Sequence, residues 1–524
     1  MGRVVVTTSG RVRGLDPVDG VEAFRGLPYA APPVGRYRFQ APQPVPAHRG
    51  VREARTPSPV APQDPRSGNG WTPASGGDYL TLDVFAPAGP AAPAAPPDGR
   101  PVLVWVHGGA YVTGAGSSPA YHPRAHVRRG TLVVSVNYRL GAEGFLAVPG
   151  APGNRALRDQ VAALEWVRDN VSAFGGDPAR VTVAGESAGA GSVAALLCAP
   201  SARGLFRRAV AHSVYGDTVT PAVADDVARR VARAARVPAT LAGFAGLPPV
   251  RLLAATEFVQ REATSAARRA RRGTASLVHV PVVGGQFLPE PLFDGPAAGG
   301  DPDVDLLVCH NDDEWRLFSL TGMGPTARTE DELGAFALAA RLDADRFARY
   351  RAALPASATP RDVADALMTD AVFAEPTTRF AARHAARGGR TFSSRFAWRS
   401  PALGFRLGAA HAVDLPFAFG NPGGWDVLLH AVPVLELARR LPVVGPRVPG
   451  VWPTPAAARL SRRMVDAWTG FVHHGDPGWP AADTTATPVH VWDGVDRREG
   501  AEAATGPGGR RRVWQGVPLD PWDL

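Results

Sequence analysis

The segment 185–189 reads Gly-Glu-Ser-Ala-Gly and presents the hydroxyl of Ser187 between two kinds of sequence. The residues before it are β-branched and apolar, as in a buried strand, and those after it are rich in alanine and leucine, as in a helix. A serine in a Gly-x-Ser-x-Gly turn between strand and helix is pushed out above the sheet, because only small residues fit beside it. The segment therefore predicts a nucleophilic serine, although an ordinary glycine-rich turn can show the same pattern.

A serine nucleophile needs a base within hydrogen-bonding distance and an acid that orients the base. Where such a turn lies in a doubly wound sheet, the chain order is nucleophile, acid, histidine. The acidic cluster 312–314 follows one apolar run and His411 lies in a loop after a later one, so the chain offers this order. His212 closes a short apolar run near Ser187 and is the strongest alternative base. Spacing alone leaves the choice between the two histidines open.

Two consecutive glycines, Gly108 and Gly109, follow His107 at the end of the apolar run 101–106. Such glycines let backbone N–H groups approach a ligand closely. A loop of this kind places an N–H opposite that of the residue after the nucleophile, here Ala188, and the donors together hold an oxyanion. We therefore expect Gly108, Gly109 and Ala188 to form an oxyanion hole whose loop His107 shapes. The alternative is an ordinary glycine turn.

The charge balance is basic, with 57 lysine plus arginine residues, 48 acidic residues and a net charge of +9. All basic residues are arginine, and the chain contains no lysine. This excludes chemistry that requires lysine, such as Schiff-base formation, pyridoxal phosphate attachment and Walker-type phosphate binding. The densest arginine runs, 268–272 and 510–512, lack interleaved aromatic residues. We therefore expect solvated surfaces there and no nucleic-acid partner.

A hydrophobic content of 45% and a charged content of 20% are typical of a soluble globular protein. No apolar stretch reaches the roughly 18 residues that a membrane span needs, and the N-terminus lacks an apolar core of signal-peptide length. Cys198 and Cys309 lie in apolar stretches, and no cysteine–histidine spacing fits a zinc site. We expect a cytoplasmic protein without a membrane span, a metal ion or a cofactor.

Apolar runs of strand length alternate with helical patterns along much of the chain. Strands are expected at 80–85, 101–106, 131–136, 181–185, 209–212, 304–309 and 391–398, and helices at 156–171 and 457–473. This alternation predicts an α/β fold with a large, mostly parallel sheet covered by helices on both faces. We expect a single domain over 1–524, with helical segments inserted at about 217–290 and 315–390. The polar, Pro/Gly-rich segment 52–77 is expected to be a surface excursion.

Together these motifs resemble the type-B carboxylesterase and cholinesterase family of α/β-hydrolases, and the match covers nearly the whole chain. The matching segments are 24–35, 107–110, 136–141, 153–154, 159–160, 170–178, 185–189, 313–314, 408–411, 468–471 and 475–477. The resemblance implies the α/β-hydrolase fold and a Ser187–Glu314–His411 triad, because this family usually has glutamate at the acid position. It also implies the same oxyanion hole, and it places Ser192 as a support of the triad.

The chain also departs from the family pattern. Segment 77–80 reads Gly-Asp-Tyr-Leu where the family has Glu-Asp-Cys-Leu, so a disulfide cysteine is absent. Asp83 stands where the family has asparagine, and Val214 where it has glycine near the acyl pocket. The resemblance implies a serine carboxylic-ester hydrolase that forms an acyl-enzyme with small-molecule esters. Open alternatives are a thioester, lactone, carbamate or amide as substrate, acyl transfer, or a non-catalytic binding role. Monomer and dimer are equally open.

Overall fold

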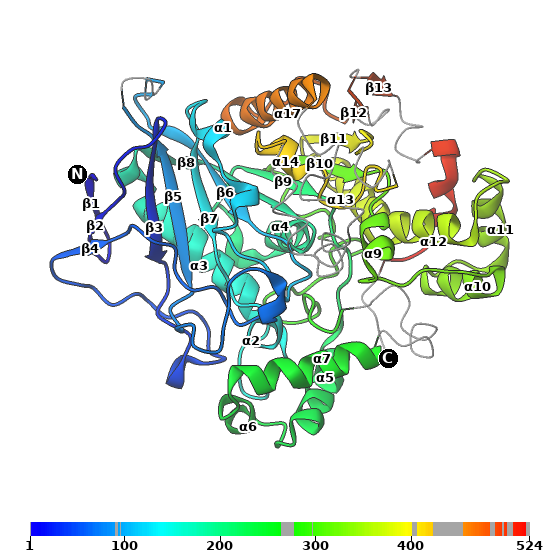
Figure 1. Ribbon diagram of the computed structural model, residues 1–524, viewed down its shortest axis with the longest axis horizontal. Coiled ribbons are helices and arrows are strands. Elements are labelled where there is room, and N and C mark those ends of the chain that lie inside the picture. Colours follow the sequence, from blue (N-terminus) through cyan, green and yellow to red (C-terminus); the bar gives the residue numbers. More distant parts are fainter. Residues whose placement is uncertain are drawn as a thin grey trace, which may run out of the picture.

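A ten-stranded mixed sheet forms the centre of the molecule in this computed structural model (Figure 1), in the order β13-β12-β11-β10-β9-β8-β6-β7-β5-β3. The structure describes residues 2–89, 93–94, 96–263, 277–295, 297–400, 406–422, 454–482, 488–494, 497–499 and 507–519. The strands of the sheet are β3 (Val21–Pro28), β5 (Thr81–Pro87), β6 (Arg100–Val106), β7 (Leu132–Val136), β8 (Gly176–Glu186), β9 (Arg208–His212), β10 (Asp305–Asn311), β11 (Thr391–Phe396), β12 (Val489–Trp492) and β13 (Arg497–Glu499). From β7 to β12 the pairing is parallel, while β3, β5 and β13 pair antiparallel with their neighbours. The strands β1 (Val4–Thr7), β2 (Gly10–Arg13) and β4 (Val51–Glu53) form a separate small sheet.

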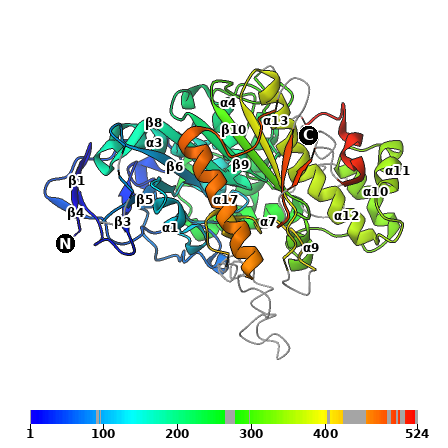
Figure 2. The same cartoon turned by 90° about the horizontal axis from the view of Figure 1, so that it is seen from above.

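Helices lie on both faces of the large sheet, as Figure 2 shows. The helices of the described residues are α1 (Arg124–Val127), α2 (Gly141–Phe145), α3 (Arg155–Asn170), α4 (Ala188–Cys198), α5 (Pro221–Ala235), α6 (Leu241–Ala245), α7 (Pro249–Ala263), α9 (Arg316–Thr321), α10 (Glu330–Ala339), α11 (Ala344–Ala352), α12 (Pro360–Thr369), α13 (Glu375–Ala386), α14 (Leu415–Ala418) and α17 (Pro455–His474). A π-helical turn, Asp370–Ala374, joins α12 to α13. None of the helices in the described ranges is long and apolar enough to cross a membrane.

Successive residues of a strand point to opposite faces, and two hydrophobic cores follow from this alternation. Val102, Val104 and Val106 of β6 belong to the core that also contains buried side chains of α3, α4 and α13. Leu103 and Trp105 of the same strand belong to the core formed with α1, α14 and α17. Because β6 is covered on both faces, its sequence is a continuous apolar run, as in the predicted mostly parallel α/β sheet.

The strand register places the chemical groups at one edge of the sheet. Val106 of β6 pairs with Gly185 of β8, and Glu186 pairs with His212 of β9. His212 in turn pairs with Cys309 of β10. Parallel strands end in the same direction, so the loops that follow these four strands converge at the carboxyl edge.

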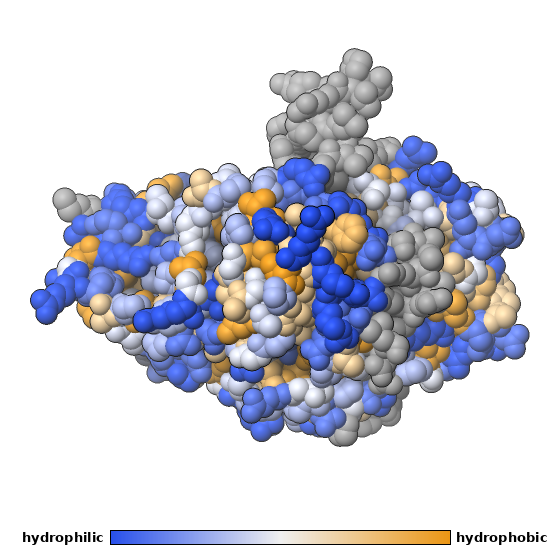
Figure 3. Space-filling model, turned by 90° about the horizontal axis from the view of Figure 1, so that it is seen from below, coloured by the Kyte–Doolittle hydropathy of each residue, from blue (hydrophilic) through white to orange (hydrophobic). Residues whose placement is uncertain are grey.

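Helices occur in both segments expected as insertions. Helices α5, α6 and α7 lie within 217–290, and helices α9 to α13 within 315–390. In Figure 1 α5 to α7 and α10 to α12 lie at the periphery, while α13 packs against β10 and β11. The arginine run 268–272 lies outside the described residues. Exposed large hydrophobic side chains are few, and in Figure 3 apolar residues form small areas among hydrophilic ones.

Segment 52–77 was expected on the surface, but part of it is buried. Val60 and Trp71 form a small apolar cluster with Ala115, and the side chain of Gln63 is fully buried. Gln63 Oε1 accepts hydrogen bonds from the Gly114 N–H at 3.0 Å and from the Thr113 hydroxyl at 2.7 Å. A polar side chain is tolerated in the interior when it is hydrogen-bonded in this way. The segment therefore braces the loop that follows β6.

A buried ion pair attaches α3 to the loop after β7. Arg139 Nη2 lies 2.6 Å from Asp159 Oδ1, and Arg139 Nε lies 2.8 Å from Asp159 Oδ2. The exposed fractions of the two side chains are 1% and 0%. Arg139 also donates to the carbonyl of Gln40 at 2.6 Å. Two buried charges of this kind are stable only while both are present.

We expect Asp159→Asn to lower the free energy of unfolding by about 3 kcal/mol, because it leaves the Arg139 guanidinium buried without a counter-charge. Chemical denaturation followed by tryptophan fluorescence measures this change. The control is Glu53→Gln, which breaks the half-exposed Arg13–Glu53 pair and should cost less than about 1 kcal/mol. Equal effects of the two substitutions would show that the Arg139–Asp159 pair has no special role.

Candidate active site

Ser187 lies in the turn between β8 and α4, with φ 59° and ψ −126°. A non-glycine residue with positive φ costs free energy and persists only where its surroundings hold it. Gly185 and Gly189 make the turn possible. A Cβ built on Gly185 would lie 2.5 Å from the carbonyl carbon of Gly189, and one on Gly189 would lie 2.2 Å from the carbonyl oxygen of Val106. Neither position has room for a side chain.

The structure brings Ser187, Glu314 and His411 together by hydrogen bonds. His411 Nε2 lies 2.8 Å from Ser187 Oγ, and His411 Nδ1 lies 2.6 Å from Glu314 Oε2. All three side chains are buried. Nδ1–H therefore donates to the carboxylate, and this leaves Nε2 free to accept the hydroxyl proton of Ser187. This is the geometry of a nucleophile, its base and an orienting acid.

Glu314 is held by groups from two strands. Its Oε1 accepts from the Ser213 hydroxyl, which follows β9, at 2.5 Å, and from the N–H of Asn311 in β10 at 2.8 Å. The other acids of the predicted cluster form different pairs. Asp312 Oδ1 accepts from Arg395 at 2.9 Å, and Asp313 Oδ1 lies 3.2 Å from Arg316. Of the three acids, only Glu314 bonds to His411. The hydrogen bonds to its Oε1 fix the carboxylate, and its Oε2 in turn orients the histidine.

The glycine loop after β6 lies against the nucleophile. A Cβ on Gly108 would lie 3.1 Å from Ser187 Cβ and 2.7 Å from the carbonyl oxygen of Glu186, so this position must be glycine. Gly109 has φ 116°. Ala188 is the first residue of α4, and N–H groups in a first helical turn have no intrahelical partner. Backbone donors from both segments are thus placed beside Ser187.

His107 fixes the shape of this loop. Its Nδ1–H donates to the Gly108 carbonyl at 2.7 Å, and its ring stacks on Tyr138 at 4.5 Å. The Tyr138 hydroxyl donates to the His107 carbonyl at 2.6 Å. Burial lowers the pKa of His107 to about 4, so the ring stays neutral. A neutral, doubly anchored histidine serves as a structural support of the loop.

Comparison with known proteins places this geometry in a family. The model of the carboxylesterase family matches residues 2–502. The chain belongs to the carboxylesterase family. It is a serine ester hydrolase with the α/β-hydrolase fold. The para-nitrobenzyl esterase of Bacillus subtilis is 31% identical over 498 residues, which cover 91% of this chain and 92% of that protein.

Two further relatives extend the comparison. The phenmedipham hydrolase of Pseudarthrobacter oxydans is 34% identical over 516 residues, covering 95% of this chain and 96% of that protein. The crystal structure of a Geobacillus stearothermophilus carboxylesterase superposes with a TM-score of 0.79 at 32% identity, covering 98% of this chain and 100% of that one. The resemblance seen in the sequence motifs is therefore confirmed for the family and the fold.

Glu186 is an additional acid beside Ser187 in this carboxylesterase, and its place inside the Gly-x-Ser-x-Gly motif does not by itself indicate a role. Its Oε1 lies 3.1 Å from His411 Nε2. Because Nε2 accepts from Ser187, this contact is favourable only when Glu186 or His411 carries a proton. Burial raises the pKa of Glu186. Burial alone lowers the pKa of His411, but the carboxylates of Glu186, Glu314 and Asp414 outweigh it and raise the pKa. The two groups therefore compete for one proton.

Aromatic side chains cover the histidine. The ring of Phe373 lies 4.4 Å from that of His411, and the ring of Phe318 lies 5.1 Å from it. Phe318 and Phe373 stack on each other at 5.9 Å, and Tyr215 lies 6.0 Å from Phe373. Phe373 belongs to the π-helical turn, a geometry that is rare and frequent at functional sites. These rings place apolar surface against the imidazole of His411.

The side chains of two predicted residues bond to partners outside the triad. Ser192 on α4 accepts from Gln160 Nε2 at 3.2 Å, and the serine that bonds directly to Glu314 is Ser213. The alternative base His212 bonds to Asp414 at 2.6 Å. Neither pairing could be read from spacing, since each joins residues from separate strands or helices.

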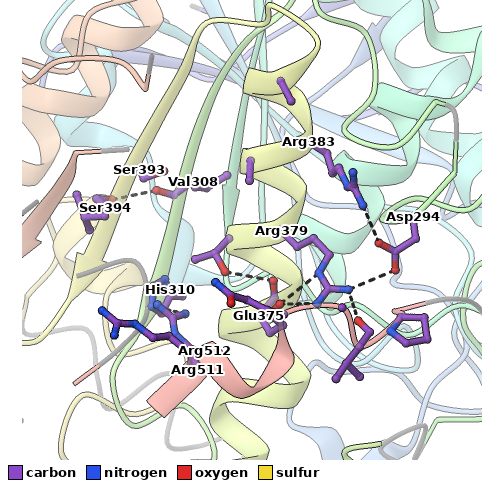
Figure 4. Close-up of a pocket in the computed structure, with 18 residues that line it drawn as sticks. Asp294, Val308, His310, Glu375, Arg379, Arg383, Ser393, Ser394, Arg511 and Arg512 are labelled. Carbon is purple, nitrogen blue, oxygen red and sulfur yellow. Dashed lines mark hydrogen bonds and ion pairs between the residues drawn. The ribbon is translucent and has the colours of Figure 1, made fainter. Parts of the chain in front are cut away.

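A cavity of about 650 Å³ lies elsewhere, between α13, the strands β10 to β12 and the C-terminal residues 511–518 (Figure 4), and no triad residue lines it. Its acids are already paired with its arginines. Arg379 bonds to Glu375 at 2.6 Å and to Asp294 at 3.3 Å, and Arg383 also bonds to Asp294, at 3.4 Å. The cavity is therefore separate from the cluster of Ser187, Glu314 and His411.

We expect Gly108→Ala to reduce kcat/KM by at least about 100-fold, because the new methyl group collides with Ser187 and moves a proposed oxyanion donor. Ester hydrolysis assays measure the loss. The control is Gly153→Ala, because a Cβ there would meet no atom within 4 Å and should leave kcat/KM unchanged. Retained activity in Gly108→Ala would rule out close packing of this loop on the nucleophile.

Proposed function

We propose that Ser187 is the nucleophile, His411 the general base and acid, and Glu314 the orienting acid in the hydrolysis of small-molecule carboxylic esters. The observation that carries the proposal is the unbroken chain of hydrogen bonds from Ser187 Oγ through His411 to Glu314. Gly108, Gly109 and Ala188 supply the N–H groups of the oxyanion hole. Ser192 stabilises α4 behind the nucleophile through its bond with Gln160.

Acylation begins when His411 Nε2 takes the proton of Ser187 and Oγ attacks the ester carbonyl carbon. The carbonyl oxygen becomes an oxyanion held by the backbone N–H groups, and each such donor contributes about 3–4 kcal/mol where it has been measured. Collapse of the intermediate breaks the bond to the alcohol oxygen, which leaves with the proton from His411. The acyl group then remains on Ser187.

Deacylation repeats these steps with water as the nucleophile. His411 removes a proton from water, the hydroxide adds to the acyl carbonyl, and Ser187 leaves and regains its proton from His411. Glu314 remains ionised and stabilises the imidazolium formed in each half-reaction. The rings of Phe318 and Phe373 beside His411 favour acyl or alcohol groups of limited size. Every step uses groups of this chain, the substrate and water.

We also propose that the enzyme is cytoplasmic. Its two cysteines, Cys198 and Cys309, are both free, which suits a reducing compartment. Small esters that enter the cell are then the accessible substrates.

We expect Ser187→Ala to abolish turnover of p-nitrophenyl acetate and butyrate, with kcat reduced by at least about 1,000-fold. A serine-directed phosphonate should label the wild type on the peptide that contains Ser187, as mass spectrometry can detect. Ser172→Ala is the control, because Ser172 is exposed on the surface. Turnover that survives in Ser187→Ala, or a folded wild type without turnover, would refute the proposed reaction.

The pH dependence of kcat/KM tests the role of Glu186. The base form of His411 is neutral, so activity is lost as pH falls through the pKa of His411. Glu186 raises that pKa, so Glu186→Gln should move the acid limb to lower pH by about one unit. Glu165→Gln, an exposed substitution on α3, should leave the limb unchanged. An unchanged limb in Glu186→Gln would mean that Glu186 does not interact electrostatically with the base.

A further inference from the structure

A second buried aspartate–histidine pair adjoins the proposed triad. His212 Nδ1 lies 2.6 Å from Asp414 Oδ2, and both side chains are buried. His212 is the last residue of β9, and Asp414 follows His411 by three residues. The pair therefore connects a central strand of the sheet to the turn that carries the proposed base.

His212 also contacts the nucleophile through its backbone. Its carbonyl accepts the N–H of Ser187 at 2.9 Å. The next residue, Ser213, donates its hydroxyl to Glu314. Two adjacent residues at the end of β9 thus contact all three loops of the triad: Ser187 and Asp414 through His212, and Glu314 through Ser213.

Asn311 of β10 supports the same carboxylate. Its Nδ2 donates to Asp414 Oδ1 at 3.0 Å and to the carbonyl of Ala410 at 2.8 Å. Burial raises the pKa of Asp414, but the hydrogen bonds from His212 and Asn311 outweigh burial and lower it. Asp414 is therefore an ionised carboxylate that accepts hydrogen bonds from His212 of β9 and from Asn311 of β10.

The turn that Asp414 anchors is strained. Ala412, next to His411, has φ 62°, an unfavourable value for alanine. Such a conformation persists only when surrounding contacts determine it. The His411 N–H donates to the Glu314 carbonyl at 3.2 Å, and the Asp414 carboxylate holds the other side of the turn.

Other roles for this cluster fit the geometry less well. The ring of His212 packs edge-on against Trp468 at 5.0 Å and its Nδ1 bonds to Asp414. Ser187 Oγ bonds to Nε2 of His411, so His411 and not His212 is in place to act on the hydroxyl. The ligand atoms of His212, Cys309 and Asp414 lie within 4.8 Å of one another. Both oxygens of Asp414 already accept hydrogen bonds, from His212 and from Asn311, so the carboxylate is satisfied without a metal ion.

We propose that His212 is a positioning residue for the reaction: its side chain fixes the His411 turn through Asp414, and its carbonyl fixes Ser187. The inference rests on the proposed roles of Ser187 and His411, and it adds a residue that touches neither substrate nor reacting atom. A displacement of about 1 Å between base and nucleophile can cost on the order of 100-fold in rate. The hydrogen bond between His212 and Asp414 therefore affects kcat more than KM.

Two substitutions at position 212 separate the hydrogen bond from packing. His212→Asn keeps a donor near the place of Nδ1, whereas His212→Leu removes it and retains apolar bulk. We expect His212→Leu to lower kcat for p-nitrophenyl butyrate at least about ten-fold with KM changed less than about three-fold, and His212→Asn to recover most of the loss. If the Leu variant does not fold, the Asn variant and Asp414→Asn carry the test.

His126→Leu is the matched control. His126 is equally buried and also contacts Trp468, at 5.9 Å, but its Nε2 bonds to the carbonyl of Ala418 at 2.8 Å. This substitution should lower Tm without a specific loss of kcat. The proposal is overturned if His212→Leu lowers only Tm, as the control does, or if His212→Asn is no more active than His212→Leu.

Asp414→Asn tests the pKa of His411, a property that a purely structural residue would not change. Glu186, Glu314 and Asp414 are the carboxylates that raise the pKa of His411, so removal of one charge should move the acid limb of kcat/KM to lower pH. The double variant His212→Leu/Asp414→Asn should lose no more kcat than the more impaired single variant, because the two residues act as one unit. Additive losses or an unmoved acid limb would contradict the proposal.

Proton NMR detects the hydrogen bond between His212 and Asp414 independently of turnover. The wild type should show two downfield imidazole N–H signals, one from the His411–Glu314 bond and one from the His212–Asp414 bond. His212→Leu should remove one signal and broaden the other. If Ser187→Ala retained turnover, the proposed reaction would fail, but this spectrum would still decide whether His212 holds the His411 turn. An unchanged His411 signal in His212→Leu would overturn the proposal.

Discussion

The backbone conformation of Ser187 is the constraint on which the rest of the site depends. At φ 59° and ψ −126° the residue would relax unless the sheet and the helix on either side held it. Its carbonyl accepts the N–H of Gly191 within α4, and its own N–H donates to the carbonyl of His212 at the end of β9. The strain of the nucleophile is therefore supported by the neighbouring strand, and it places Oγ within reach of His411.

Residues with strained backbone conformations are concentrated in the loops around Ser187. Five of the ten non-glycine residues with positive φ in the described ranges lie in the loops of the site: Ala110, Tyr111, Ser187, Ser213 and Ala412. Each loop is held by buried polar side chains. Gln63 and Tyr138 hold the glycine loop, and Asn311 and Asp414 hold the His411 turn. The geometry of the reacting groups is thus determined by a surrounding layer of hydrogen bonds, whose loss should affect rate before fold.

The sequence predicted much of the central sheet because several strands are apolar runs with clear ends, as in β6, whereas β8 begins at Gly176, before the apolar run expected at 181–185. The sequence also indicated that Ser187 and His411 lie beyond the ends of strands, because each residue follows an apolar run. It could not predict the partners of His212 or Ser213, since hydrogen bonds between loops from separate strands leave no periodicity. The burial of Gln63 could not be predicted for a related reason. A polar residue in a Pro/Gly-rich segment is expected to be exposed unless its hydrogen-bond partners are known. Glu186 was visible inside the motif, but its contact with His411 depends on the curvature of the turn.

The spread of these contacts along the chain has a consequence for biosynthesis. The loop of the proposed oxyanion hole is braced by residue 63, and the proposed nucleophile, acid and base are at 187, 314 and 411. A ribosome-bound chain that has exposed only its first 400 residues holds the serine, its glycine loop and its acid but has no base. If these roles hold, reactivity toward esters arises only after residue 411 has emerged, and a product truncated before it would be inert even if its sheet had begun to form.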